Sequence, residues 1–540
     1  MERPAHKRKV RGITALTSIV LTLGFATASA QCSLNTGSGT TSEPYQISSA
    51  DDFDAIVECG LDKAYELTRS IDFEGGTPAT ATAGTAFTGS LESSDTSKRA
   101  LINYVVSSTS DNVGLFAQLG NGARLERLFI AGASVSGNAS GFGNVGAIAG
   151  KSTGSVSMSD VVVRSSTVSA TSSGPNAIAG GFVGGVEGRL AITNYAVHEV
   201  SVSSDRSVTT AQAGGLIGQA GNGGVSAVVL TAREGWVNAT VKNTNFGGGG
   251  LIGFIGVNSN VLVEGLRLTA RLHDMAGSFG GAVGRIDLNA NISDGTPTAL
   301  EVREAVVNVT ELVGQPARNG SEPDYGTLVG LVPPDEPFST SLTDVAVYQF
   351  SGPTAESFAF ERNDALYAFM PAGAAAVENV VVVNEGAGTL ANVDALPASV
   401  YWHSLSGDIT SAQGTEVTDL QNMKDQATYS SLDFNSVWEM ELDGFPTLQQ
   451  VAHPPLTLPA SAFGSTVTPT NVSLTADGSS NAVVSVEIRD FAGNAYVGGD
   501  EPAPMMTVSP STAGSLSSPT SEGAGIYSFT FTAGTQAGVA

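Results

Sequence analysis

The sequence predicts an all-β protein, a right-handed parallel β-helix followed by a partial β-sandwich. Glycine occupies 65 of 540 positions and only 14% of the residues are charged, a composition that favours turn-rich β-structure over helices. A Gly-apolar-apolar motif returns at a nearly constant spacing, which indicates a stacked repeat. Beyond about residue 460 the pattern changes to alternating apolar and polar residues, which is typical of half-exposed strands.

The repeat is marked by seven glycines, spaced 32, 35, 34, 35, 31 and 45 residues apart. They are Gly114, Gly146, Gly181, Gly215, Gly250, Gly281 and Gly326. We attribute the one long step to a polar insertion at 287–298. Each unit carries short apolar runs that cannot bury an apolar face alone, so the units must stack as parallel sheets about 4.8 Å apart. A glycine in each unit then indicates a tight corner or a close backbone approach.

The alternative architectures for such a period are a propeller or a sandwich. Propeller blades of 40 or more residues with aromatic signatures are absent from the sequence. We therefore expect six segments: a signal peptide at 1–30, an N-terminal cap at 31–110, β-helix repeats at 111–402, a closing segment at 403–450 that caps the last coil, a Pro-rich linker at 451–460, and an incomplete C-terminal domain at 461–540.

The first 30 residues have the layout of a Sec-type signal. Five basic residues precede an apolar stretch at 13–26 and the sequence Ala28-Ser29-Ala30. A transmembrane anchor is the alternative, but about 14 apolar residues fall short of the roughly 20 that a bilayer requires. We expect cleavage after Ala30 and a secreted or cell-surface protein, which touches a membrane only through export or through an anchor outside this chain.

The net charge argues against one class of binding partner, and the two cysteines favour a disulfide. The net charge is −26, and removing residues 1–30, with five basic residues and Glu2, leaves −30. Nucleic acid is therefore an implausible partner. Export to an oxidising compartment favours a disulfide between Cys32 and Cys59. A pair of metal ligands is the alternative, although no histidine lies near either cysteine in the sequence.

The Gly-Gly-Leu-Ile-Gly sequences at 214–218 and 249–253 resemble the GLUG motif of bacterial surface proteins. The segments at 43–53, 423–429 and 445–448 are similar to the beginning and end of such proteins, so the resemblance covers roughly 32–450. It implies a β-helix, and a setting among adhesins, large exoproteins or proteins with protease domains.

The alternating runs at 472–478, 483–490 and 525–532 are similar to the immunoglobulin-like domain of the intimin and invasin type. That resemblance implies a strand in each run. Because the sequence stops before the last strand of such a domain, we expect a longer gene product.

No catalytic, cofactor or metal site is predicted. His198-Glu199 lacks the second histidine of a zinc protease motif. The segment 287–292 lacks the glycine and the final glutamate of a calcium loop. Asp160 and Glu264 occupy similar strands without other signs of a glycosidase pair. The basic residues that could serve a lyase are scattered, namely Lys151, Arg189, Arg233 and Arg271.

These observations lead to an adhesin-like protein that presents a β-helix surface to an extracellular glycan or protein. Insertions in solenoids map to one face, so the possible contact loop is Asp287, Asn289, Asn291 and Asp294. Two alternatives remain open: a polysaccharide-degrading β-helix enzyme, or a structural spacer that binds nothing.

Overall fold

The computed structural model describes residues 32–94, 98–205, 207–221, 227–242, 244–287, 298–314, 324–331, 338–349, 354–355, 362–364, 375–384, 397–405, 414–441, 444–449, 460–469, 473–490, 508, 510–523 and 525–536. The expected signal peptide, the linker and most of the expected contact loop lie outside these residues. Within them, no helix is long and apolar enough to cross a membrane.

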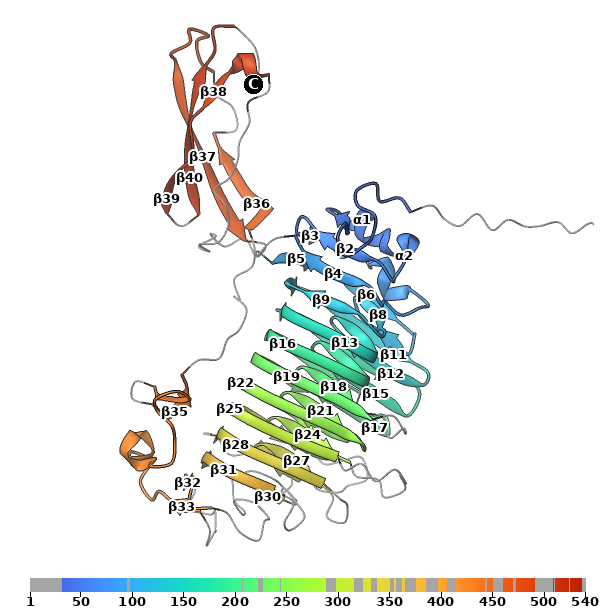
Figure 1. Ribbon diagram of the computed structural model, residues 1–540, viewed down its shortest axis with the longest axis vertical. Helices are drawn as coiled ribbons and strands as arrows, with labels where there is room; N and C mark the ends of the chain where they lie inside the picture. The colour runs from blue at the N-terminus through green and yellow to red at the C-terminus, as the bar shows by residue number, and fades with distance from the viewer. Residues whose placement is uncertain are drawn as a thin grey trace, which may run out of the picture.

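Stacked parallel strands form the main body, a parallel β-helix (Figure 1). Within the described residues, one sheet has 25 strands, beginning with β1 (Tyr45–Ile47), β2 (Ala64–Leu67) and β3 (Ile71–Asp72). Its other strands are β4 (Ser90–Ser93), β5 (Arg99–Ile102), β6 (Val105–Ser108), β8 (Phe116–Leu119), β9 (Arg124–Glu126), β10 (Leu128–Ala131), β11 (Ser134–Ala139), β13 (Ala149–Arg164), β14 (Thr167–Ser172), β16 (Val183–Ser204), β18 (Ile217–Ala220), β19 (Val228–Lys242), β21 (Ile252–Ile255), β22 (Ser259–Met275), β24 (Val283–Ile286), β25 (Thr298–Gly314), β27 (Val329–Leu331), β28 (Phe338–Gln349), β29 (Thr354–Ala355), β31 (Ala375–Asn384), β32 (Val400–Ser404) and β33 (Thr415–Glu416).

A second sheet of eight short strands closes each coil. Its strands are β7 (Asn112–Val113), β12 (Phe142–Gly146), β15 (Asn176–Gly180), β17 (Thr210–Gly214), β20 (Gly247–Gly249), β23 (Ser278–Gly280), β26 (Asp324–Gly326) and β30 (Arg362–Asp364). In each coil the chain passes from a short strand into the large sheet, as from β15 into β16. Residues that point inward along β16, such as Ile192, Val197 and Val202, are fully buried in one continuous core.

The repeat glycines fall into two structural positions, which differs from the single position that the motif suggested. The strand register pairs Gly146 with Gly180, and the same column continues through Gly214, Gly249, Gly280 and Gly326. Gly181, Gly215, Gly250 and Gly281 lie one residue later. Several units have two consecutive glycines, whereas the units of Gly114, Gly146 and Gly326 have one. The sequence alone does not show which glycine of a pair aligns with the single glycine.

Each position excludes a side chain for a different reason. A Cβ at Gly214 would lie 2.0 Å from the carbonyl oxygen of Ile217 in its own corner. A Cβ at Gly215 would lie 2.0 Å from the carbonyl oxygen of Gly250 in the next coil. The final glycine of the motif, Gly218, faces the Ala179 carbonyl oxygen at 2.6 Å. The motif therefore marks a corner at which backbone packs directly on backbone.

The long step in the repeat has two sources. Eleven residues separate β24 from β25, whereas three separate β21 from β22. Nine residues separate β25 from β26, whereas two separate β22 from β23. The expected insertion at 287–298 thus accounts for only part of the added length.

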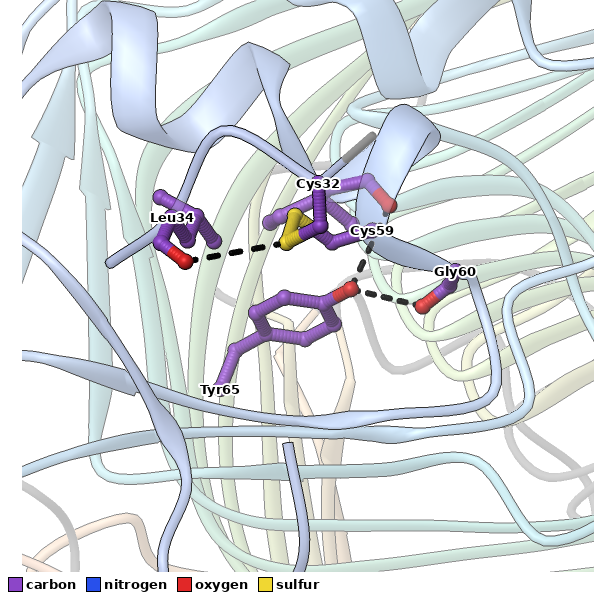
Figure 2. Close-up of a disulfide and its surroundings, with 6 residues drawn as sticks. Cys32, Leu34, Cys59, Gly60 and Tyr65 are labelled. Carbon is purple, nitrogen blue, oxygen red and sulfur yellow. Dashed lines mark hydrogen bonds between the residues drawn. A yellow bond between two sulfur atoms is a disulfide. The ribbon is translucent and has the colours of Figure 1, made fainter. Parts of the chain in front are cut away.

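The N-terminal end is covered by α1 (Ala50–Asp54) and α2 (Ile56–Cys59). Ser49 caps α1, because its hydroxyl accepts a hydrogen bond from the Asp52 backbone N–H at 3.1 Å. Phe53 and Ile56 are buried in the core of the β-helix. The disulfide expected between Cys32 and Cys59 is present, and it ties the segment before β1 to the end of α2 (Figure 2).

The closing segment differs from the expected cap. After β33 it forms the short 3-10 helices η2 (Asn422–Lys424) and η3 (Gln426–Thr428) and the hairpin of β34 (Trp438–Met440) and β35 (Pro446–Leu448). Its apolar residues pack on the outward side chains of β28, β31 and β32, in a cluster separate from the main core. The segment therefore extends along the side of several coils instead of only across the last one (Figure 1).

The C-terminal domain is an antiparallel sheet with a small core of its own. Its strands are β36 (Ala460–Thr468), β37 (Asn481–Asp490), β38 (Gly514–Leu516), β39 (Thr520–Gly523) and β40 (Ile526–Ala533), with η4 (Ser511–Ala513) before β38. The runs at 483–490 and 525–532 form strands as expected. Residues 473–478 do not, because the Asp477 carboxylate accepts hydrogen bonds from the backbone N–H groups of Ser479 and Ser480 and makes a turn there.

Replacing both Cys32 and Cys59 with alanine should loosen the N-terminal cap. The disulfide joins residues 27 positions apart, and opening a loop of this length costs about 3–4 kcal/mol in the chain-entropy account. Hydrogen exchange should then become faster in β1 and β2 and stay unchanged in β19 and β22. Equal protection of β1 in both proteins would contradict this expectation.

Gly215→Ala should destabilise the β-helix by about 1–3 kcal/mol, because its Cβ would overlap the Gly250 carbonyl oxygen. Gly84→Ala is the matched control, since nothing lies within 4 Å of a Cβ there, and it should change stability by less than about 0.5 kcal/mol. Urea unfolding followed by circular dichroism measures both. Similar midpoints for the two variants would show that the corner tolerates a side chain.

Candidate functional site

A lateral groove of about 1060 Å³ lies between the β-helix and the hairpin of β34 and β35. We call it the lateral groove. Its walls come from β19, β22 and β25 on one side and from Glu439, Glu441, Thr447 and Gln449 on the other. Its charged and aromatic lining residues are Arg233, Glu234, Trp236, Glu264, Arg267, Glu304, Glu439 and Glu441.

A column of left-handed backbone conformations places the acidic side chains on the helix wall. Each of these long strands has a residue with a positive φ at this level, namely Glu234 (56°), Gly265 (65°) and Glu304 (48°) in successive coils. The register skips this residue while the strands on either side stay paired. Two glutamates in the column therefore line the groove, with a glycine between them.

The same column shows where Asp160 and Glu264, the candidate glycosidase pair of the sequence, lie relative to each other. Asp160 belongs to the column, with a φ of 56°, and Glu264 lies one position before it on β22. Three coil steps, roughly 14 Å, separate β13 from β22. The structure therefore does not bring these two carboxylates together as a pair.

The hairpin is held by hydrogen bonds to two strands of the β-helix, β28 and β22. The Trp438 indole Nε1 donates a hydrogen bond to Asp344 Oδ1 at 3.2 Å, and the Tyr348 hydroxyl donates to the Pro446 carbonyl oxygen at 2.5 Å. Further along the groove, Arg267 donates to the Leu448 carbonyl oxygen and lies 3.8 Å from Glu439. Arg267 thus links β22 directly to β35.

Carboxylates outnumber cations in the groove. Arg233 Nε lies 3.3 Å from Glu264 Oε2, and Arg267 pairs with Glu439, so both arginines already face an acid. Glu234, Glu304 and Glu441 remain in excess. Burial raises the pKa of Glu304, and the nearby charges of Glu264 and Asp344 raise it further. The groove is therefore an acidic surface with one indole, that of Trp236, in its wall.

The other sequence candidates lie elsewhere. Of the expected contact loop, Asp287 borders a smaller groove on a different set of strands, whereas Asn289, Asn291 and Asp294 lie outside the described residues. His198 lies in a strand, with its ring 5.6 Å from that of Trp236. Lys151 pairs with Glu187 at 2.6 Å on the strands β13 and β16. No group of three or more metal-ligating side chains occurs in the part of the chain that the structure describes.

Sequence reasoning missed most of the lateral groove. The sequence suggested Arg233 only as one of several scattered basic residues and Glu264 only as a partner for Asp160. Trp438 and Arg267 are about 170 residues apart in the chain, so no local pattern joins them. One sequence pattern could have indicated the groove: Glu234, Gly265 and Glu304 occupy equivalent positions in successive repeats. A glycine that alternates with acidic residues at one repeat position indicates a sharp bend of the backbone.

Comparisons with known proteins bear mainly on the C-terminal domain. Residues 461–540 match the family model for domain 3 of invasin. No match was found among curated proteins. A solved structure of a candidate immunoglobulin A1 protease from Bacteroides ovatus aligns with a TM-score of 0.35 and 15% identity, over 76% of this chain and 94% of that chain. That likeness is too weak to bear on function.

Arg267→Ala should loosen the attachment of the hairpin to the β-helix, although the contacts of Trp438 and Tyr348 remain. Hydrogen bonds to charged groups contribute about 1.5–3 kcal/mol, so hydrogen exchange at 438–448 should accelerate by roughly tenfold or more. Arg233→Ala is the control, because Arg233 pairs with Glu264 and not with the hairpin. If both variants protect 438–448 equally, Arg267 does not hold the hairpin.

The similarity to invasin domain 3 supports an immunoglobulin-like domain of the invasin type at 461–540, and domains of this family are typical of bacterial surface proteins.

Proposed function

We propose that this protein is an exported, adhesin-like surface protein that binds a basic segment of an extracellular protein in its lateral groove. The signal-like sequence at 1–30 supports export. The match of the C-terminal domain to invasin supports a role at the bacterial surface. The repeats with their GLUG-like motif supply a long, rigid support for the groove.

The choice of a basic ligand rests on the excess of acidic side chains in the lateral groove. The lateral groove holds five glutamates against two arginines, both of which are already paired. Ammonium or guanidinium groups of a ligand would offset the remaining charge, and Trp236 lines the same groove. The acidity of the whole chain would also speed the approach of a basic partner.

The binding experiment uses a fluorescein-labelled octalysine peptide and measures anisotropy with the purified protein. Glu304→Gln and Glu441→Gln should each weaken binding about 2- to 5-fold, which corresponds to roughly 0.5–1 kcal/mol per charge. Glu58→Gln is the matched control, because Glu58 is exposed on α2 and does not line the groove. Binding should also weaken as salt is added.

The pH dependence follows from the raised pKa of Glu304. A glutamate with a raised pKa takes up a proton at a higher pH than an ordinary one, so acidification removes this charge early and the affinity for octalysine should fall. Glu304→Gln should lose part of that dependence. Equal losses for Glu304→Gln and Glu58→Gln, or equal binding of octaglutamate, would contradict the proposal.

A second candidate function is cleavage of a polysaccharide. Glu264 contributes to the raised pKa of Glu304, so the two carboxylates lie close to each other in the groove. Glycoside cleavage uses one protonated and one ionised carboxylate. New reducing ends or unsaturated products formed by the wild type but not by Glu304→Gln would replace the binding proposal with this one.

A further inference from the structure

A second, smaller groove of about 330 Å³ lies on different strands from the lateral groove. We call it the amide groove. The short strands β15 and β17 form one side, and the other side comes from β18, β21 and the residues that follow β21 and β24. The two grooves share no lining residue. The volume is at the low end of the ~300–1,000 Å³ range of small-molecule sites.

Gln212 of β17 is the unusual residue of this groove. The residue is only 2% exposed, yet its amide oxygen Oε1 has no hydrogen-bond partner. The register places Ile178 on one side of it and Gly247 on the other, and neither residue has a polar side chain that could reach it. A buried acceptor without a partner is unfavourable, and a donor group on a ligand would relieve this.

An aromatic surface lies beside this acceptor. The rings of Phe246 and Phe254 are 5.5 Å apart, and the Arg285 guanidinium lies 4.2 Å above the Phe246 ring. Phe142 stands at the rim with 60% of its surface exposed. Aromatic rings beside amide groups suit a ligand that has apolar C–H faces and hydroxyl donors together.

The charges of the groove favour a neutral ligand. Arg285 is engaged with Phe246, and it lies close enough to Asp287 and Asp324 for their charges to act on it. Among the described residues, Asp287 is the one charged residue of the lining, and its charge acts on the neighbouring Arg285. The remaining polar lining groups are uncharged: Asn176, Thr210, Gln212 and Gln219. This differs from the lateral groove, in which carboxylates are in excess.

We propose that the amide groove is a binding site for a neutral sugar residue of an extracellular glycan, with Gln212 Oε1 accepting a hydrogen bond from a sugar hydroxyl. The ring face packs against the phenylalanines, and Asn176 and Gln219 supply further polar contacts. This site goes beyond the function proposed for the lateral groove, since both the strands and the ligand chemistry differ.

The test first screens an array of neutral and acidic oligosaccharides, and then titrates the methyl glycosides of the bound sugars by saturation-transfer NMR. Gln212→Met keeps the length of the side chain and removes the acceptor, so binding of neutral sugars should fall at least tenfold. The melting temperature should stay equal or rise, because an unpaired buried acceptor has been removed. Gln118→Met is the matched control, since Gln118 donates to Thr153 outside the groove.

Phe142→Ala provides a second route that does not depend on a buried substitution. Its exposed ring contributes little to packing, so the protein should fold normally and bind neutral sugars several-fold more weakly. Octalysine binding should be unchanged in Gln212→Met and Phe142→Ala, which separates this site from the lateral groove.

Three results would overturn the proposal: an array without neutral glycan hits, unchanged sugar binding in both variants, or preferential binding of neutral peptides that competes with the sugars.

Discussion

Direct contact between backbones at the glycine corner is the constraint on which the rest of the molecule depends. At Gly214, Gly215 and Gly218 a carbonyl oxygen occupies the space of a side chain, once from the same corner and otherwise from a neighbouring coil. Successive coils can approach to strand-pairing distance only because these positions lack a Cβ. The short sheet and the large sheet thereby enclose one core, and the spacing of the outward side chains along the solenoid becomes fixed.

Much of this architecture could be read from the sequence because it is local and repeated. The glycine period predicted the stacked coils, and the two cysteines near the start of the mature chain predicted the disulfide. The sequence did not show which of two consecutive glycines, such as Gly180 and Gly181, aligns with the glycine of the next coil. Only the strand register, which pairs Gly180 with Gly214, distinguishes them. The strand expected at 472–478 is not present in its described part, 473–478, where the Asp477 side chain forms a turn.

The grooves were harder to predict, because each depends on residues from distant parts of the chain. The lateral groove requires the hairpin to return along the solenoid and contact Arg267. The amide groove requires Gln212 to lie between Ile178 and Gly247, a placement that only the register reveals. The first is acidic and open, whereas the second is small and nearly neutral, so one rigid framework can present two ligand chemistries on separate strands.

The path of the closing segment has a consequence for how the solenoid comes apart. Stacked coils touch only their neighbours, so unwinding ordinarily starts at an end and proceeds one coil at a time. Here the last coil cannot peel away alone, because the hairpin that follows it is also attached to β28 and, through Arg267, to β22. Several coils must be released in a single event, so this end of the β-helix should resist pulling forces as a unit.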